Sequence, residues 1–246
     1  MRYFLEIAYK GTNYAGWQIQ KNAFTVQQEL NEALQMVFRN PIKTIGSGRT
    51  DTGVHAPQQF VHLDLEVELT QKHIHSLNCI LSDQVAVRSF IRVKDEAHAR
   101  FDALSRAYEY KISTIKDPFN KDLTWFFDKS LDVHKMNEAC AILQKHKDFQ
   151  AFSKVHTDVN NYLCDIFNAE WFASSQLLVF KIEANRFLRG MVRAIGGTML
   201  EVGLHRLSLE EFEKVILIRD RAKAGNALPP QGLHLMKISY PDDIKY

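Results

Sequence analysis

The amino-acid sequence predicts an α+β fold, with antiparallel strands and helices mixed along the whole chain. The strongest strand pattern covers residues 60–69, where apolar and charged or polar side chains alternate, so one face is expected to be buried and the other wet. Apolar residues at helical spacing follow Thr25 and Ser208, each with a Gln or Glu three positions later, which is the pattern of a capping box. One-sided strands among capped helices favour antiparallel sheets over a parallel α/β fold.

The same two periodicities predict the other elements. Strands are expected near 3–9, 85–93, 106–112, 177–183 and 232–240, and helices near 26–37, after Thr70, and near 132–145 and 185–202. The charged segment 94–102 is the best candidate for a hinge between the two groups of elements. We therefore expect an N-terminal half at 1–103 and a C-terminal half at 104–246.

Composition places few limits on function. The chain has 246 residues, 46% of them hydrophobic, and a formal net charge of only +2, so any nucleic-acid site must be a local basic surface. Its three cysteines form no CxxC pair, which favours a reducing compartment. The first ten residues alternate instead of forming an apolar run, and no segment has the length of a membrane span. A cytoplasmic protein without a membrane partner is expected.

The loop 46–56 is the most unusual stretch, because it holds three glycines around one acid and one base, Asp51 and Arg49. Backbone N–H groups and the hydroxyls of Thr50 and Thr52 could hold the Asp51 carboxylate, and a carboxylate can act as a nucleophile. Arg49 could keep it ionised or bind a phosphate. The glycine spacing matches neither a phosphate-binding P-loop nor a dinucleotide-binding loop. The alternative is a turn in which Asp51 caps its own backbone.

A second candidate feature is a row of arginines. Arg186, Arg189 and Arg193 fall on one face of the helix predicted at 185–202, and no acid lies between residues 184 and 200. A buried guanidinium needs an anion, which could be Asp51 or an RNA phosphate. The alternative is a helix packed on a sheet, with its arginines extended to water.

Two tyrosines on one strand face form the third feature. Tyr108 and Tyr110 lie on the same side of the predicted strand as Arg106, and tyrosines beside a base can stack on a nucleobase. The alternative is core packing with the hydroxyl bound to a partner, which we favour for Tyr110.

Metal binding is not expected. His73 and His75 could share a strand face, but no third ligand accompanies them. Cys79, Cys140 and Cys164 are interpreted as small buried hydrophobic residues.

Several ordered motifs resemble the tRNA pseudouridine synthase A family, and together they span most of the chain. Gly-Arg-Thr-Asp-Thr-Gly-Val-His-Ala at 48–56 is similar to the family's signature loop, with Thr52 in place of the usual alanine. The other resembling motifs lie at 9–18, 98–101, 106–110, 191–193, 201–203 and 231–235. The segment 149–168 departs more from the family pattern, and 78–83 lacks an expected proline.

The resemblance implies that Asp51 is the catalytic nucleophile, that Tyr108 stacks on the target base and that Arg193 pairs with Asp51. Arg49, Arg186 and Arg189 are expected to contact the RNA. The family's fold is two RRM-like (ferredoxin-like) halves whose sheets join into one central sheet with flanking helices. Members are usually homodimers that bind tRNA, use no cofactor or metal, and isomerise uridines at positions 38–40, in the anticodon stem-loop.

Three other functions remain open from the residues. A non-catalytic RNA-binding protein would use the arginines and tyrosines, although a carboxylate such as Asp51 repels phosphate. A small-molecule hydrolase or phosphotransferase could use Asp51 covalently and would be expected to need a metal. A pseudouridine synthase acting on a different RNA would show the same residues.

Overall fold

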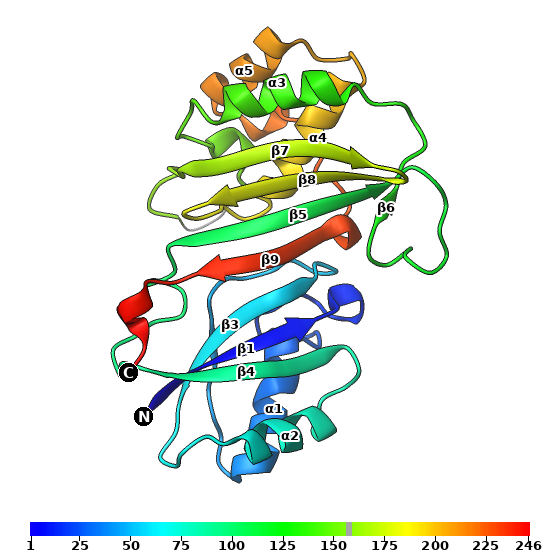
Figure 1. Ribbon diagram of the computed structural model, residues 1–246. Coiled ribbons are helices and arrows are strands. Elements are labelled where there is room, and N and C mark those ends of the chain that lie inside the picture. Colours follow the sequence, from blue (N-terminus) through cyan, green and yellow to red (C-terminus); the bar gives the residue numbers. More distant parts are fainter. Residues whose placement is uncertain (156–158) are drawn as a thin grey trace. The chain divides into compact units, whose positions relative to one another are not determined.

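The computed structural model describes residues 1–155 and 159–246; residues 156–158, within the divergent segment 149–168, lie outside the described part. The chain forms two compact units, one made of Met1–Leu104 with His234–Tyr246 and the other of Ser105–Leu233 (Figure 1). Five α-helices and two sheets occur among the described residues, which confirms the α+β class. No α-helix in this described part is long and apolar enough to cross a membrane.

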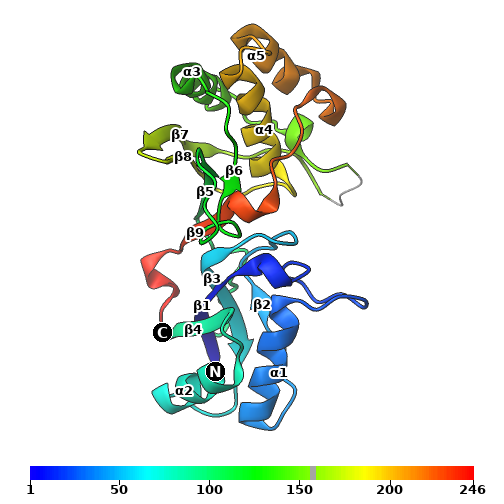
Figure 2. The same ribbon diagram turned by 90° about the vertical axis from the view of Figure 1, so that its right-hand side faces the viewer.

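The first unit is built on an antiparallel sheet of order β2-β3-β1-β4. Its strands are β1 (Arg2–Tyr9), β2 (Ile45–Gly46), β3 (Ala56–Asp64) and β4 (Val85–Val93). Two helices, α1 (Val26–Phe38) and α2 (Gln71–Ile80), contact each other, and α2 packs on β4 (Figure 2). The strand β9 (Leu233–Ser239) lies almost wholly in this unit, where the N–H of Leu235 donates to the carbonyl of His55.

Strand β3 corrects the prediction for 60–69. The strand begins earlier and ends at Asp64, so Val67, expected on the buried face, is 53% exposed. His62, expected on the wet face, is buried at 4% exposure. Its Nδ1 accepts a hydrogen bond from the N–H of Ala99 at 3.1 Å, and its ring lies 4.6 Å from that of His98. His98 and Ala99 therefore cover the face of β3 that was expected to be wet, so the alternation of residues did not separate core from surface there.

The buried His62 makes stability depend on pH. Burial, then the charges of His98 and Arg2, lower the pKa of His62 from its ordinary 6.5 to about 4, although Asp64 and Asp102 oppose the shift. Between pH 6.5 and about pH 4, His62 is therefore protonated in the unfolded chain but neutral in the folded chain.

We expect the free energy of unfolding to fall as the pH drops from 6.5 towards 4, and to fall less in His62→Asn, whose amide oxygen can still accept the Ala99 N–H. Denaturant titrations at pH 7 and pH 5 measure both proteins. If the free energy of unfolding falls equally in the wild type and in His62→Asn, another group causes the pH dependence.

The second unit is built on strands in the order β6-β5-β8-β7. They are β5 (Ser105–Ser113), β6 (Trp125–Phe126), β7 (Ile166–Ser174) and β8 (Leu177–Ala184). The helices are α3 (Val133–Leu143), α4 (Met191–Gly203) and α5 (Leu209–Ile218), which contact one another, and α3 packs on β7. Strand β7 was not predicted; its pattern is partly masked by exposed aromatic residues such as Phe167.

Helix α4 begins six residues later than the predicted 185–202. Asn185 exchanges hydrogen bonds with Asp165 through backbone and side chain, which keeps the chain beside the start of β7. Gly190 then takes a left-handed conformation, with φ of 73°, as the N-cap. Arg186 and Arg189 therefore precede the helix, and the predicted arginine face on one helix is wrong.

Smaller predictions had mixed outcomes. Ser208 and Glu211 form the expected capping box, whereas Thr25 caps the N–H of Gln28 and the Gln28 amide donates instead to Glu32. His73 and His75 lie on α2 and not on a strand. Cys140 and Cys164 are buried as expected, but Cys79 is exposed.

Candidate active site

Asp51 starts a tight turn in the loop between β2 and β3. The N–H of Val54 donates to the backbone carbonyl of Asp51 at 3.1 Å, which closes a four-residue turn. Gly53, the third residue of that turn, has φ of 77°, a value that favours glycine and indicates a type II turn. The turn leaves Asp51 half-buried and Arg49 exposed.

The loop is held on one side by the segment after β1. The N–H of Trp17 donates to the carbonyl of Thr50 at 3.1 Å, and the hydroxyls of Tyr9 and Thr50 are 2.9 Å apart. Gly16, at φ of 88°, allows this approach, because a Cβ there would lie 2.5 Å from the Thr50 oxygen. The N–H of Gly11 donates to Nδ1 of the buried His55 at 3.0 Å. The residues on both sides of Asp51 are thus fixed by one segment.

A buried glutamine holds the other side of the loop. Oε1 of Gln59 accepts from the hydroxyl of Ser47 at 2.6 Å, and its Nε2 donates to the carbonyl of Gly48 at 3.0 Å. Hydrogen bonds from both flanks therefore hold the backbone of the loop, which limits how far the Asp51 carboxylate can be displaced.

The Tyr9–Thr50 contact predicts a coupled effect on turnover. We expect Tyr9→Phe and Thr50→Val each to lower kcat about tenfold, since a small displacement of a reacting group is costly. The double variant should be no worse than either single variant, because both remove the same bond.

Tyr3→Phe is the matched control for this pair. Tyr3 is a buried tyrosine on the same strand, and its hydroxyl accepts from the N–H of Leu69 at 3.3 Å. It should lose stability without losing turnover. Additive losses for Tyr9 and Thr50, or a loss of kcat in the control, would contradict a positioning role.

In the second unit, β5 places Tyr108 and Tyr110 on one face by strand alternation. Tyr110 is fully buried and its hydroxyl donates to the carbonyl of Pro229 at 2.7 Å, which confirms core packing for this residue. Burial raises the pKa of Tyr110 well above its ordinary value. Tyr108 is half-buried, and its ring meets that of Phe187 edge to face at 5.2 Å between centroids. Tyr108 is thus the tyrosine of the pair with surface left for a partner.

Arg193 lies in the first turn of α4, where its neighbours on the helix are buried. Its Nε donates to the carbonyl of Leu228 at 2.5 Å, and the N–H of Leu228 donates back to the Arg193 carbonyl at 3.0 Å. Gly197 makes this possible, since a Cβ there would collide with the carbonyl of Asn226. The segment after α5 therefore orients the guanidinium of Arg193.

The other arginines lie apart from α4. Nη1 of Arg186 is 3.4 Å from Oδ1 of Asn161, and Arg189 is exposed. Sequence reasoning also missed Tyr9 and Leu228 as supports, because nothing in the sequence places them beside Thr50 and Arg193. Asp51 belongs to the first unit, and Tyr108 and Arg193 to the second.

The first unit thus offers a carboxylate on a held backbone turn, and the second unit offers a partly exposed aromatic ring and an oriented guanidinium. A family model described as tRNA pseudouridine synthase matches residues 139–241. Over 99% of this chain, proteins named tRNA pseudouridine synthase A are 47% identical in Parabacteroides distasonis, 46% in Bacteroides fragilis and 47% in Bacteroides thetaiotaomicron, covering 97%, 98% and 92% of those proteins. The chain belongs to the tRNA pseudouridine synthase A family.

Proposed function

We propose that this protein is a tRNA pseudouridine synthase, an isomerase that converts uridine to pseudouridine in tRNA with Asp51 as nucleophile. The observation that supports this most directly is the clamped turn at Asp51, inside the motif at 48–56 that resembles the family's signature loop. The near full-length identity to proteins named tRNA pseudouridine synthase A supports the substrate class.

The reaction needs no co-reactant. The bond from C1′ to N1 breaks, the base rotates, and C5 bonds to C1′; the hydrogen on C5 leaves to water and N1 gains a proton. A carboxylate can attack or stabilise an electron-poor anomeric carbon, as it does in glycosidases. The target nucleotide must also leave the stack, which costs a few kcal/mol.

Other side chains have proposed roles in this reaction. Tyr108 stacks on the target base and offsets part of the unstacking cost. Arg193 pairs with Asp51 during the reaction. Arg49, Arg186 and Arg189 contact RNA phosphates.

Finer properties belong to the same proposal. The target uridines are those at positions 38–40, in the anticodon stem-loop of tRNA, and the working protein is a cytoplasmic homodimer without cofactor or metal. Its fold has two RRM-like (ferredoxin-like) halves whose sheets join into one central sheet. These properties rest on the family resemblance.

The test uses an unmodified tRNA transcript with tritium at C5 of uridine, in the presence of chelator. Release of tritium to water, together with pseudouridine in the digested RNA, is expected. Binding without release across several tRNAs would favour a non-catalytic RNA-binding protein. Release from other RNAs but not from tRNA would favour a different RNA substrate, and turnover restored only by metal would favour the hydrolase or phosphotransferase.

A further inference from the structure

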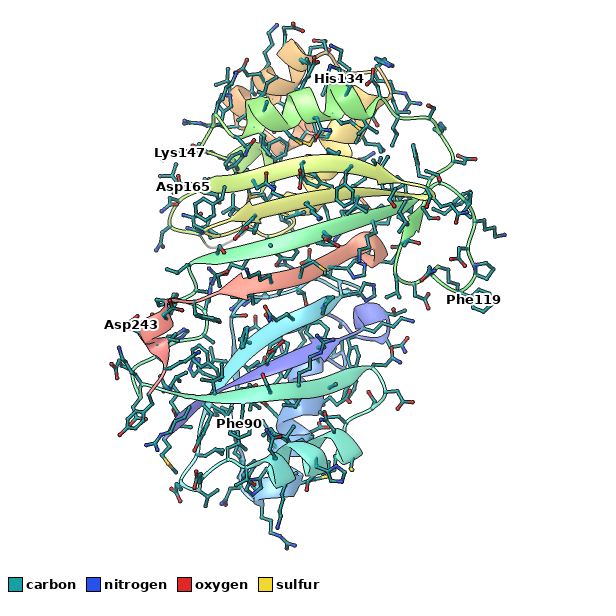
Figure 3. The ribbon with its side chains drawn as sticks, viewed as in Figure 1. Phe90, Phe119, His134, Lys147, Asp165 and Asp243 are labelled. Atoms are coloured by element: carbon teal, nitrogen blue, oxygen red, sulfur yellow. The ribbon has the colours of Figure 1, made fainter. Side chains whose placement is uncertain are left out.

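The segment between β5 and β6, residues 114–124, carries an exposed phenylalanine. Phe119 is 92% exposed, the largest exposed fraction among the large hydrophobic side chains of the described residues. Figure 3 shows it at the outer edge of its loop, away from the strands. Folding gains almost nothing from a phenylalanine in this position, so nearly the whole ring is open to a binding partner.

The base of this loop is tied to the sheet. The N–H of Thr114 donates to the carbonyl of Gln176 at 3.0 Å, and the N–H of Phe127 donates to the backbone carbonyl of Ser113 at 2.9 Å. The ends of β5 and β6 also pair in parallel, with Ile112 opposite Trp125. The loop therefore leaves and rejoins the sheet at fixed points.

The tip of the loop has its own hydrogen bonds. Oδ1 of Asp117 accepts from the N–H of Phe119 at 2.9 Å, and its Oδ2 accepts from Nδ2 of Asn120 at 2.6 Å. These bonds lower the pKa of the Asp117 carboxyl, with the Asn120 bond the larger cause. Pro118 restricts φ between them, and the carbonyl of Asn120 accepts from the N–H of Thr124 at 3.0 Å. Phe119 is thus presented on an ordered backbone, which lowers the entropy lost on binding.

The charges around Phe119 select the kind of partner. Lys116 and Lys121, both exposed, flank the ring in sequence. Of the two acids in the loop, Asp117 uses both carboxylate oxygens within the loop, and the half-buried Asp122 follows Lys121. Lysine is depleted at the centres of protein–protein interfaces, so a second copy of this chain is a poor match. An aromatic ring with an exposed lysine on each side in the sequence suits RNA, whose bases stack and whose phosphates bind cations.

We propose that residues 114–121 form an RNA-contact loop, in which Phe119 stacks on an unpaired base of tRNA and Lys116 and Lys121 bind adjacent phosphates. This contact is separate from Asp51 and its supports, and it rests on the proposed function in taking tRNA as the partner. The loop contributes to holding the substrate and takes no part in the chemistry.

Phe119→Ala should weaken tRNA binding about tenfold, within the range for loss of one base–aromatic stack, and Phe119→Trp should restore binding. Turnover at saturating tRNA should stay unchanged in both. Phe167→Ala is the matched control, since Phe167 is a 54% exposed phenylalanine on β7 of the same unit. Thermal unfolding of each variant separates binding losses from folding losses.

Variants of the two lysines test the same contact independently. The double variant Lys116→Ala with Lys121→Ala should lower the slope of log Kd against log salt concentration by about 1 to 2, as expected when two phosphate contacts are lost. Lys145→Ala, an exposed lysine after α3, should leave the slope unchanged.

Two results would overturn the proposal. One is an unchanged Kd and salt slope in these variants while the wild-type protein binds and modifies tRNA. The other is a change of oligomeric state in Phe119→Ala with unchanged affinity for tRNA, which would assign the loop to a second copy of the chain. A wild-type protein that neither binds nor modifies tRNA would instead refute the proposed function.

Discussion

Asp51→Asn should abolish pseudouridine formation and leave tRNA binding within about twofold of the wild type. The amide has the shape of the carboxylate but lacks its charge, so it cannot act as a nucleophile. The turn should survive, because its closing bond runs from the N–H of Val54 to the backbone carbonyl of residue 51. Loss of an essential nucleophile lowers kcat by about 10⁴-fold or more.

Single-turnover tritium release, tRNA affinity and thermal unfolding measure the three parts of this expectation. Asp243→Asn is a suitable control, since Asp243 is an exposed aspartate paired with Lys94 at 3.2 Å and should be dispensable for turnover. Substantial release by Asp51→Asn would remove Asp51 from the nucleophile role, provided that mass spectrometry excludes deamidation back to aspartate.

Arg193→Met is expected to lower kcat about 100-fold, the usual size of effect when a preorganised charged donor is lost. Methionine keeps much of the aliphatic stem and removes the guanidinium, so the buried surroundings of α4 should be disturbed little. KM for tRNA should change much less than kcat, because the proposed partner of Arg193 is Asp51 and not the RNA.

The matched control for this prediction is Arg221→Met. Nη1 of Arg221 donates to the carbonyls of Ala224 and Gly225, so it supports the same segment that binds Arg193. Arg221→Met should cost stability and leave kcat near the wild-type value. Equal losses of kcat in the two variants would show that Arg193 acts only through the fold of this segment.

Local sequence patterns predicted some of the elements well. The strand at 85–93 matches β4, and the capping box at Ser208 is present. The predictions that failed depended on residues distant in the sequence. Ala99 and His98 cover His62, and hydrogen bonds with Asp165 hold Asn185 outside α4, so the helix begins later than predicted. Periodicity describes what one segment can bury, and it does not state which other segment covers it.

In the candidate site, too, the sequence indicates residues within short motifs but not the distant residues that contact them. Asp51, Tyr108 and Arg193 could be chosen from motifs, because family resemblance acts on short stretches of sequence. Their supports could not, since Tyr9 reaches Thr50 across 41 positions and Leu228 reaches Arg193 across 35. Hydrogen bonds between segments far apart in the sequence appear only once the chain is folded.

The composition of the first unit bears on the order in which the protein can fold during synthesis. Several of its hydrogen bonds come from the C-terminal segment 234–246, among them Leu235 with His55, Ile238 with Gln58, and Tyr240 with Ala99. The ribosome makes this segment only after the whole second unit, although domains generally fold as the N-terminal part emerges. The strand that follows the Asp51 loop therefore gains these neighbours only when synthesis of the chain is nearly complete.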